Sequence, residues 1–93
     1  MFVSLAIHRP KPSAEPGLID AMHRFGDAAR GAPGLQRIHT LRSAEDGVLV
    51  GLAIWDTEDA FHSARVTMRA AIADVDFSAL EDVGTHVYLL VDV

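Results

Sequence analysis

Five histidines and the absence of cysteine set the range of chemistry open to this chain of 93 residues. A neutral imidazole accepts a proton near pH 7, so a histidine beside a pocket can act as a general base. Without cysteine there is no thiol nucleophile and no thiolate metal ligand. No two histidines share a metal-binding spacing on one helix and no carboxylate completes a ligand set, so the sequence predicts no metal site. The five are His8, His23, His39, His62 and His86.

His62 is the candidate base, because it follows the chain's single tryptophan, Trp55, at the start of an expected helix. The two side chains are therefore expected at the same end of the domain. Each has a second interpretation that the sequence leaves open. His62 falls off the apolar stripe of its helix and can be a solvated residue beside Arg65. Trp55 can be a core aromatic at the end of a buried strand instead of a pocket wall.

Composition excludes several classes of partner. Thirteen acidic residues against eight basic ones give a net charge of −5, which repels a phosphate backbone, and the arginines form no basic stripe. The longest apolar runs, 48–55 and 87–91, are far shorter than the roughly 20 residues of a membrane-spanning helix. Residues 1–7 lack the basic start of a signal peptide. The sequence therefore predicts a cytoplasmic protein with neither nucleic acid nor membrane as a partner.

Hydrophobic periodicity predicts one domain, 1–93, with the element order βαββαβ. Helices are expected at 15–30 and from a cap at Asp56 or Thr57 to about residue 73. Alternating apolar residues indicate strands at 2–9, 35–42, 48–55 and 85–91. Right-handed connections then give a four-stranded antiparallel sheet in the order 4-1-3-2 with both helices on one face. This is the ferredoxin-like α+β arrangement.

The strand residues separate by parity into an aliphatic face and a mixed face. Two helices cover only one face, and the other would expose a larger apolar patch than monomers usually carry. The sequence therefore predicts a homodimer that buries the aliphatic faces against each other. A register slip of one residue would reverse the assignment of a strand. The residues assigned to the aliphatic face are Val3, Leu5, Ile7, Val48, Val50, Leu52, Ile54, Val87, Leu89 and Val91.

The mixed face is expected to lie under the helices. Gly51 and Ala53 are small, and they either allow the helices to pack closely or leave a pocket; both interpretations stay open. His8 and His86 fall near the far end of this face and are interpreted as a structural polar pair. His62 is expected at the edge of the pocket, whose predicted lining is Phe25, Gly51, Ala53, Trp55, Phe61, Met68 and Tyr88.

Three segments carry a family resemblance: Ala32-Pro33-Gly34-Leu35, the turn from Ser43 to Gly47, and AIWDTEDAF at 53–61. With the element order, they make the chain similar to the antibiotic biosynthesis monooxygenase family of the dimeric α+β barrel superfamily. The resemblance implies a barrel-like dimer and a pocket walled by Trp55. It also implies that an aromatic substrate, held as its anion, reacts directly with dioxygen and needs no metal, flavin or other cofactor.

The haem-degrading branch of that superfamily differs at two positions. It carries Asn-Arg in the first strand, where this chain has His8-Arg9, and its iron-ligating histidine aligns near Arg65 and not at His62. Two functional hypotheses remain. The first is a cofactor-independent monooxygenase, an oxidoreductase that acts on a small aromatic or quinol substrate, with His62 accepting the substrate proton. The second is a non-catalytic dimeric module that binds a small hydrophobic molecule or serves a structural role.

Overall fold

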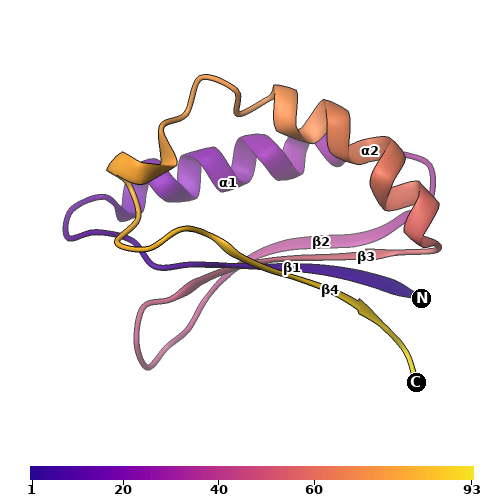
Figure 1. The fold of residues 1–93 in the computed structure, drawn as a ribbon, viewed down its shortest axis with the longest axis horizontal. Coiled ribbons are helices and arrows are strands. Elements are labelled where there is room, and N and C mark those ends of the chain that lie inside the picture. The colour runs from indigo at the N-terminus through magenta and orange to yellow at the C-terminus, as the bar shows by residue number, and fades with distance from the viewer.

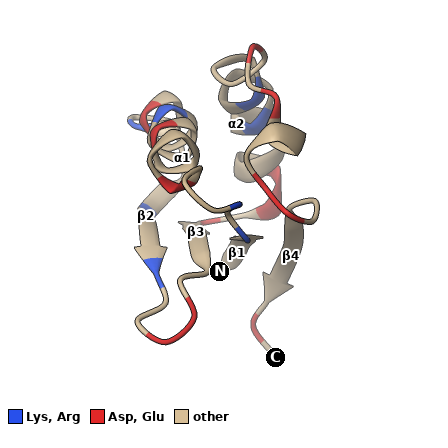
Figure 2. Ribbon diagram, turned by 90° about the vertical axis from the view of Figure 1, so that its left-hand side faces the viewer, with Lys and Arg blue, Asp and Glu red and all other residues tan.

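A four-stranded antiparallel sheet forms one layer of the molecule and two helices form the other, as the computed structural model of residues 1–93 shows (Figure 1). The strands lie in the order β2-β3-β1-β4. Both helices cover the same face of the sheet (Figure 2). The predicted ferredoxin-like arrangement is therefore confirmed. The bounds are β1 Phe2–His8, α1 Glu15–Ala29, β2 Leu35–Arg42, β3 Leu49–Trp55, α2 Glu58–Ala70, the short 3₁₀ helix η1 Phe77–Ala79, and β4 His86–Val91.

The two helices begin and end on recognisable signals. Pro16 occupies the first turn of α1, and Gly31, with φ at 79°, follows its end. Thr57 caps α2 by accepting a hydrogen bond from the backbone N–H of Ala60 at 3.1 Å. The last turn of α2 ends at Ala70, a few residues before the predicted end near residue 73. Neither helix is long and apolar enough to cross a membrane.

An arginine joins the two helices near the end of α2. Arg24 of α1 donates to the backbone oxygen of Ala71 at 2.8 Å and to the Asp74 carboxylate at 2.6 Å. The hydrogen bond from Arg24 holds the pKa of the Asp74 carboxyl below its ordinary value. The end of α2 is thereby fixed against α1.

The pairing of β1 with β3 confirms the predicted faces of these two strands. Phe2 lies opposite Trp55 and His8 lies opposite Leu49, and all four side chains are buried beneath the helices. The residues between them on the other face, such as Leu5 opposite Leu52, are half-buried on the side that no helix covers. This second side is called the open face below.

The predicted faces of β4 are wrong. In the register with β1, Val87 lies opposite Ala6 and Leu89 opposite Ser4, so these two residues face the helices and not the open face. Tyr88 lies opposite Leu5 and therefore faces away from the helices. The five residues from 87 to 91 are all apolar, so alternation carried no information about which of them point inward.

A bulge at Gln36 sets the faces of β2. Leu35 lies opposite Trp55, but the next pair is Arg37 with Ile54, so one extra residue is inserted in β2. Leu35 and Ile38 consequently both pack against the core, although their spacing in sequence is odd. The bulge therefore lets β2 contribute two apolar residues to the helix side while Arg37 stays exposed on the open face.

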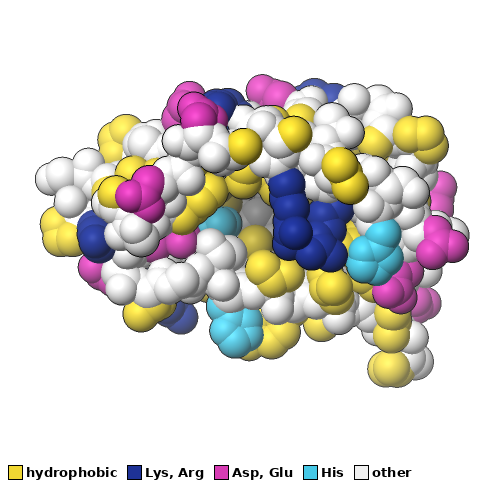
Figure 3. All heavy atoms as spheres, turned by 45° about the horizontal axis from the view of Figure 1, so that its top comes forward, with side chains coloured by type: hydrophobic (Ala, Val, Ile, Leu, Met, Phe, Trp, Pro, Cys, Tyr) yellow, Lys and Arg dark blue, Asp and Glu magenta, His cyan; other side chains and the backbone are white.

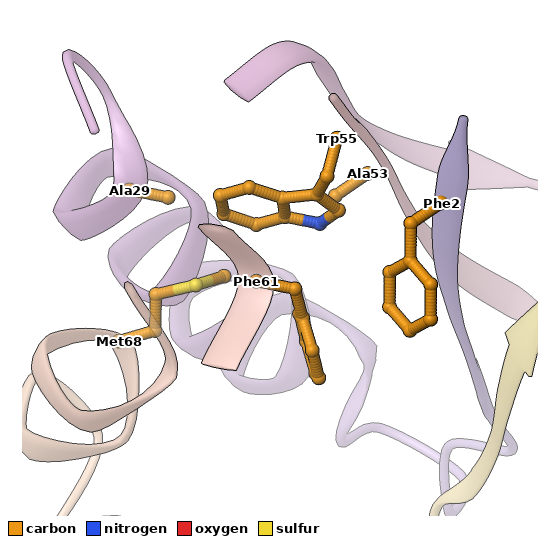
Figure 4. Close-up of a cluster of buried hydrophobic side chains, with 6 residues drawn as sticks. All are labelled: Phe2, Ala29, Ala53, Trp55, Phe61 and Met68. Carbon is orange, nitrogen blue, oxygen red and sulfur yellow. The ribbon is translucent and has the colours of Figure 1, made fainter. Parts of the chain in front are cut away.

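The core beneath the helices consists of two clusters. The larger gathers around Trp55, whose ring meets Phe61 edge-on with 5.9 Å between ring centres (Figure 4). The indole Nε1–H donates to the Ser4 hydroxyl at 3.2 Å, which satisfies the buried indole. The larger cluster comprises Phe2, Ala29, Ala53, Trp55, Phe61 and Met68, and the smaller comprises Leu18, Met22 and Leu49.

Gly34→Ala should destabilise the fold by about 2 kcal/mol or more, as measured by urea unfolding. Gly34 has φ at 84°, and a Cβ there would lie 2.6 Å from the Cβ of Ala60, which is too close for two non-bonded carbons. Gly31→Ala is the matched control, since Gly31 also has a positive φ but a Cβ would meet nothing within 4 Å. The control should cost only about 1 kcal/mol. Equal losses in the two variants would contradict the contact with Ala60.

Candidate functional site

A cavity of about 480 Å³ lies between the sheet and the helices. It sits where the covered face of β1 and β3 has only small residues: Ser4 opposite Ala53, and Ala6 opposite Gly51. Close packing does not require the glycine, because a Cβ at Gly51 would meet Met22 Cε only at 3.7 Å. These four residues, called the small-residue block below, therefore leave space beneath the helices instead of drawing the helices closer.

The walls of the cavity are mostly apolar and come from both helices and from β4. Phe25 of α1 and Phe61 and Met68 of α2 line it, together with Val87 and Leu89 of β4. Figure 2 shows α2 and β4 on the same side of the molecule, and every residue of β4 is exposed. Figure 3 shows an opening on this side, with basic side chains at its border. The basic residues that line the cavity are Arg65 and Arg69.

A buried polar cluster lies at one end of the cavity. His8 and Glu81 are only 8% and 4% exposed, and His8 Nδ1 contacts a Glu81 carboxylate oxygen directly. The Thr85 hydroxyl donates to the other Glu81 oxygen at 3.0 Å and lies 3.2 Å from His8 Nδ1. The His8 ring also stacks on Phe77 at 6.2 Å. Both His8 and Thr85 line the cavity.

The backbone places Glu81 beside the end of β1. Pro10 forms an isolated bridge with Glu81, and Lys11 N–H donates to the Leu80 oxygen at 2.8 Å. Asp82 N–H donates to the Arg9 oxygen at 3.0 Å. The segment that returns from α2 to β4 is therefore held along residues 9–11 by the two hydrogen bonds of this bridge, which bring the Glu81 carboxylate to His8.

The contact with Glu81 leaves one nitrogen of His8 available for chemistry. An ionised carboxylate only accepts hydrogen bonds, so a neutral His8 carries its proton on Nδ1. Nε2 has no hydrogen-bond partner in the protein, whereas every fully buried side-chain nitrogen and oxygen has one, so Nε2 is accessible. With the proton on Nδ1, Nε2 is a hydrogen-bond acceptor on a residue that lines the cavity. A carboxylate that orients an imidazole in this way is a familiar arrangement for general bases.

Five of the predicted pocket residues line the cavity: Phe25, Gly51, Ala53, Phe61 and Met68. Trp55 does not line it, since the ring is completely buried in the larger cluster. Tyr88 lies on the open face, where its ring is 4.5 Å from that of His86. The predicted pair of His8 with His86 does not form, because β4 directs His86 to the open face opposite Ile7.

His62 lies outside the cavity. Its ring is on the exposed surface of α2, where Nε2 is 3.0 Å from a Glu58 carboxylate oxygen one turn earlier. Nothing in the sequence points to Glu81, which belongs to an irregular segment and pairs with His8 from the other end of the chain. No group of three or more histidine, aspartate or glutamate side chains is arranged to hold a metal ion.

Proteins of the same fold are known from bacteria. Rv0793 from Mycobacterium tuberculosis superposes with a TM-score of 0.85 at 19% identity, over 99% of this chain and 94% of that one. A Nitrosomonas europaea protein provisionally named antibiotic biosynthesis monooxygenase has a TM-score of 0.75 at 18% identity, over 99% and 98%. A further structure named antibiotic biosynthesis monooxygenase gives 0.80 at 17% identity, over 100% and 99%.

The chain thus has the fold of structures named antibiotic biosynthesis monooxygenase, as the resemblance in sequence implied. No family model and no curated protein matches the chain. At these identities the likeness establishes the fold alone. The function must therefore be argued from the cavity and its polar cluster.

Glu81→Ala should lower the free energy of unfolding by about 2 kcal/mol, because it leaves the buried His8 and Thr85 without their acceptor. Glu58→Ala is the matched control, since it removes a carboxylate from a second histidine in an exposed pair. The control should cost less than about 1 kcal/mol. Urea unfolding of both variants measures the difference, and equal effects would show that the buried cluster does not stabilise the fold.

Proposed function

We propose that the protein binds a small, reduced aromatic molecule in the cavity and oxidises it with dioxygen without a cofactor. The observation that carries the proposal is His8, whose accessible nitrogen lies at the polar end of a mostly apolar cavity. A cavity of about 480 Å³ suits a molecule of two or three fused rings. The shared fold with structures named antibiotic biosynthesis monooxygenase supports the same class of reaction.

The proposed reaction needs one base and one oxidant. His8 Nε2 accepts the proton of a phenolic hydroxyl, and Glu81 stabilises the imidazolium that forms. The resulting phenolate donates electrons to dioxygen, and a carbon–oxygen bond forms at the ring carbon ortho or para to the phenolate oxygen, which carries one hydrogen. The peroxide oxygen takes back the proton from His8, and the phenolate C–O becomes a carbonyl. Loss of water from this hydroperoxide removes the ring hydrogen, breaks the O–O bond and converts the C–H carbon to C=O. Dioxygen is thereby reduced, with one oxygen atom in the product and one in water.

The base proposed here differs from the one that the sequence predicts. The sequence favours His62, but His62 is exposed and paired with Glu58 on the surface of α2. His8 instead lines the cavity and is oriented by a buried carboxylate. We therefore assign the proton transfer to His8.

His8→Ala should lower the rate of oxygen consumption with an anthrone or a dihydroxynaphthalene by about a hundredfold or more, because a general base contributes that much. His62→Ala, the matched control, should leave the rate within about twofold. An oxygen electrode measures both, and circular dichroism verifies that each variant is folded. Loss of activity in His62→Ala with activity retained in His8→Ala would overturn this assignment.

A second variant tests the cavity itself. Ala6→Leu places a larger apolar side chain in the small-residue block and should abolish both binding and turnover while the protein stays folded. Binding of aromatic molecules by the unaltered protein with no oxygen consumption would favour the alternative of a non-catalytic binding module.

We also propose that two copies pair through their open faces. The face that no helix covers exposes apolar side chains, including Leu41, Tyr88 and Leu90 at 43–46%. A closed two-fold contact would bury the same patch on both copies. The half-buried residues of β1 and β3 beside them, such as Leu5 and Leu52, would form the centre of this contact.

Leu90→Lys should convert the protein from a dimer to a monomer, because it places a charge within the proposed contact. Val66→Lys, on the exposed surface of α2, is the control and should leave the assembly unchanged. Sedimentation at micromolar concentration measures the mass. A monomeric unaltered protein would contradict the proposed dimer.

A further inference from the structure

Two arginines without a counter-ion border the cavity, and we propose that they bind the carboxylate of an anionic aromatic ligand. Arg65 and Arg69 lie one turn apart on α2, and both line the cavity. This inference rests on the proposed function, because it specifies the class of molecule that the cavity takes. It adds a binding role for two residues that the proposed proton transfer does not use.

Arg65 and Arg69 are the arginines that combine a place in the cavity lining with the lack of an ion pair. Arg24, Arg30 and Arg42 each form an ion pair with a carboxylate. The side chains of Arg65 and Arg69 form no ion pair and no hydrogen bond with the protein. Like charges at this spacing repel each other on a helix, so an anion between them would relieve the repulsion.

The overall charge of the chain makes the cavity border unusual. The net charge is −5, so most of the surface repels anions, whereas two positive charges lie close together at the cavity border. A guanidinium binds a planar carboxylate through two parallel hydrogen bonds, which are stronger than hydrogen bonds between neutral groups. The chemistry of the border therefore matches a carboxylate better than a neutral substituent.

The three parts of the cavity together specify the ligand. The small-residue block and the apolar walls accept the rings, His8 accepts a phenolic hydroxyl, and the arginines accept the carboxylate. The ligand class is therefore a hydroxylated aromatic carboxylate. Its hydroxyl and its carboxylate stand at different positions of the ring system, because His8 comes from β1 and the arginines come from α2.

A matched pair of ligands tests the inference: 6-hydroxy-2-naphthoate, and 2-naphthol, which lacks the carboxylate. Fluorescence titration should give a Kd for the carboxylate about tenfold lower than for 2-naphthol. In Arg65→Met/Arg69→Met this advantage should disappear, while the Kd for 2-naphthol changes less than twofold. Raising the salt concentration from 20 mM to 500 mM should weaken binding of the carboxylate only. Screening of charges is weak at about 20 mM salt and strong at about 500 mM.

Arg37→Met is the control for the loss of a positive charge outside the cavity. Arg37 is exposed on the open face and does not line the cavity, so its loss should leave the preference for the carboxylate unchanged. Equal affinity for the two ligands, or a preference that survives in the double variant, would overturn the inference and leave the proposed function intact. Failure of both ligands to bind the unaltered protein would overturn the proposed function as well.

Discussion

The space beneath the helices depends on a pattern of side-chain size along two paired strands. Phe2 and Trp55 form a large pair at one end of the covered face, and His8 and Leu49 form a large pair at the other. Between them lies the small-residue block. The helices rest on the two core clusters, which contain Phe2, Trp55 and Leu49, and the small side chains of the block leave space between the sheet and the helices. The cavity is thus a direct result of residue size at paired positions.

The two ends of this span are fastened by different kinds of interaction. At the Trp55 end, Asp56 N–H donates to the Gly34 oxygen at 2.8 Å, and Gln36 donates to the Asp56 carboxylate at 2.6 Å. The rest of that end is aromatic packing. At the His8 end, a buried carboxylate holds the imidazole and a threonine. The proposed base therefore belongs to the same cluster that closes the fold at that end, which keeps its side chain in place before any ligand binds.

Much of the architecture could be predicted from the sequence, because its signals are local. The stop at Gly31, the cap at Thr57 and the alternation in β1 and β3 each depend on neighbouring residues, and the structure follows them. The faces of β4 could not be predicted, since an unbroken apolar run has no periodicity. The register with β1 decides them instead.

The candidate site was less accessible to prediction, because it depends on contacts between distant residues. Five apolar lining residues followed from strand parity and helix periodicity. The role of Glu81 did not, since nothing near it in the sequence indicates that the loop will carry its carboxylate to His8. Trp55 shows the opposite case: an indole can satisfy its N–H with a serine on the neighbouring strand, and then needs no pocket.

The position of β4 has a consequence for how the chain behaves at high concentration. It is an edge strand with one side unpaired, it is apolar from Val87 to Val91, and it is exposed throughout. Such edges are templates for strand-to-strand aggregation unless something protects them. Charged residues flank the strand here: Asp82 before it, and Asp92, which pairs with the amino terminus at 3.3 Å, directly after it. These flanking charges oppose uncontrolled growth of the sheet at an edge that the helices leave bare.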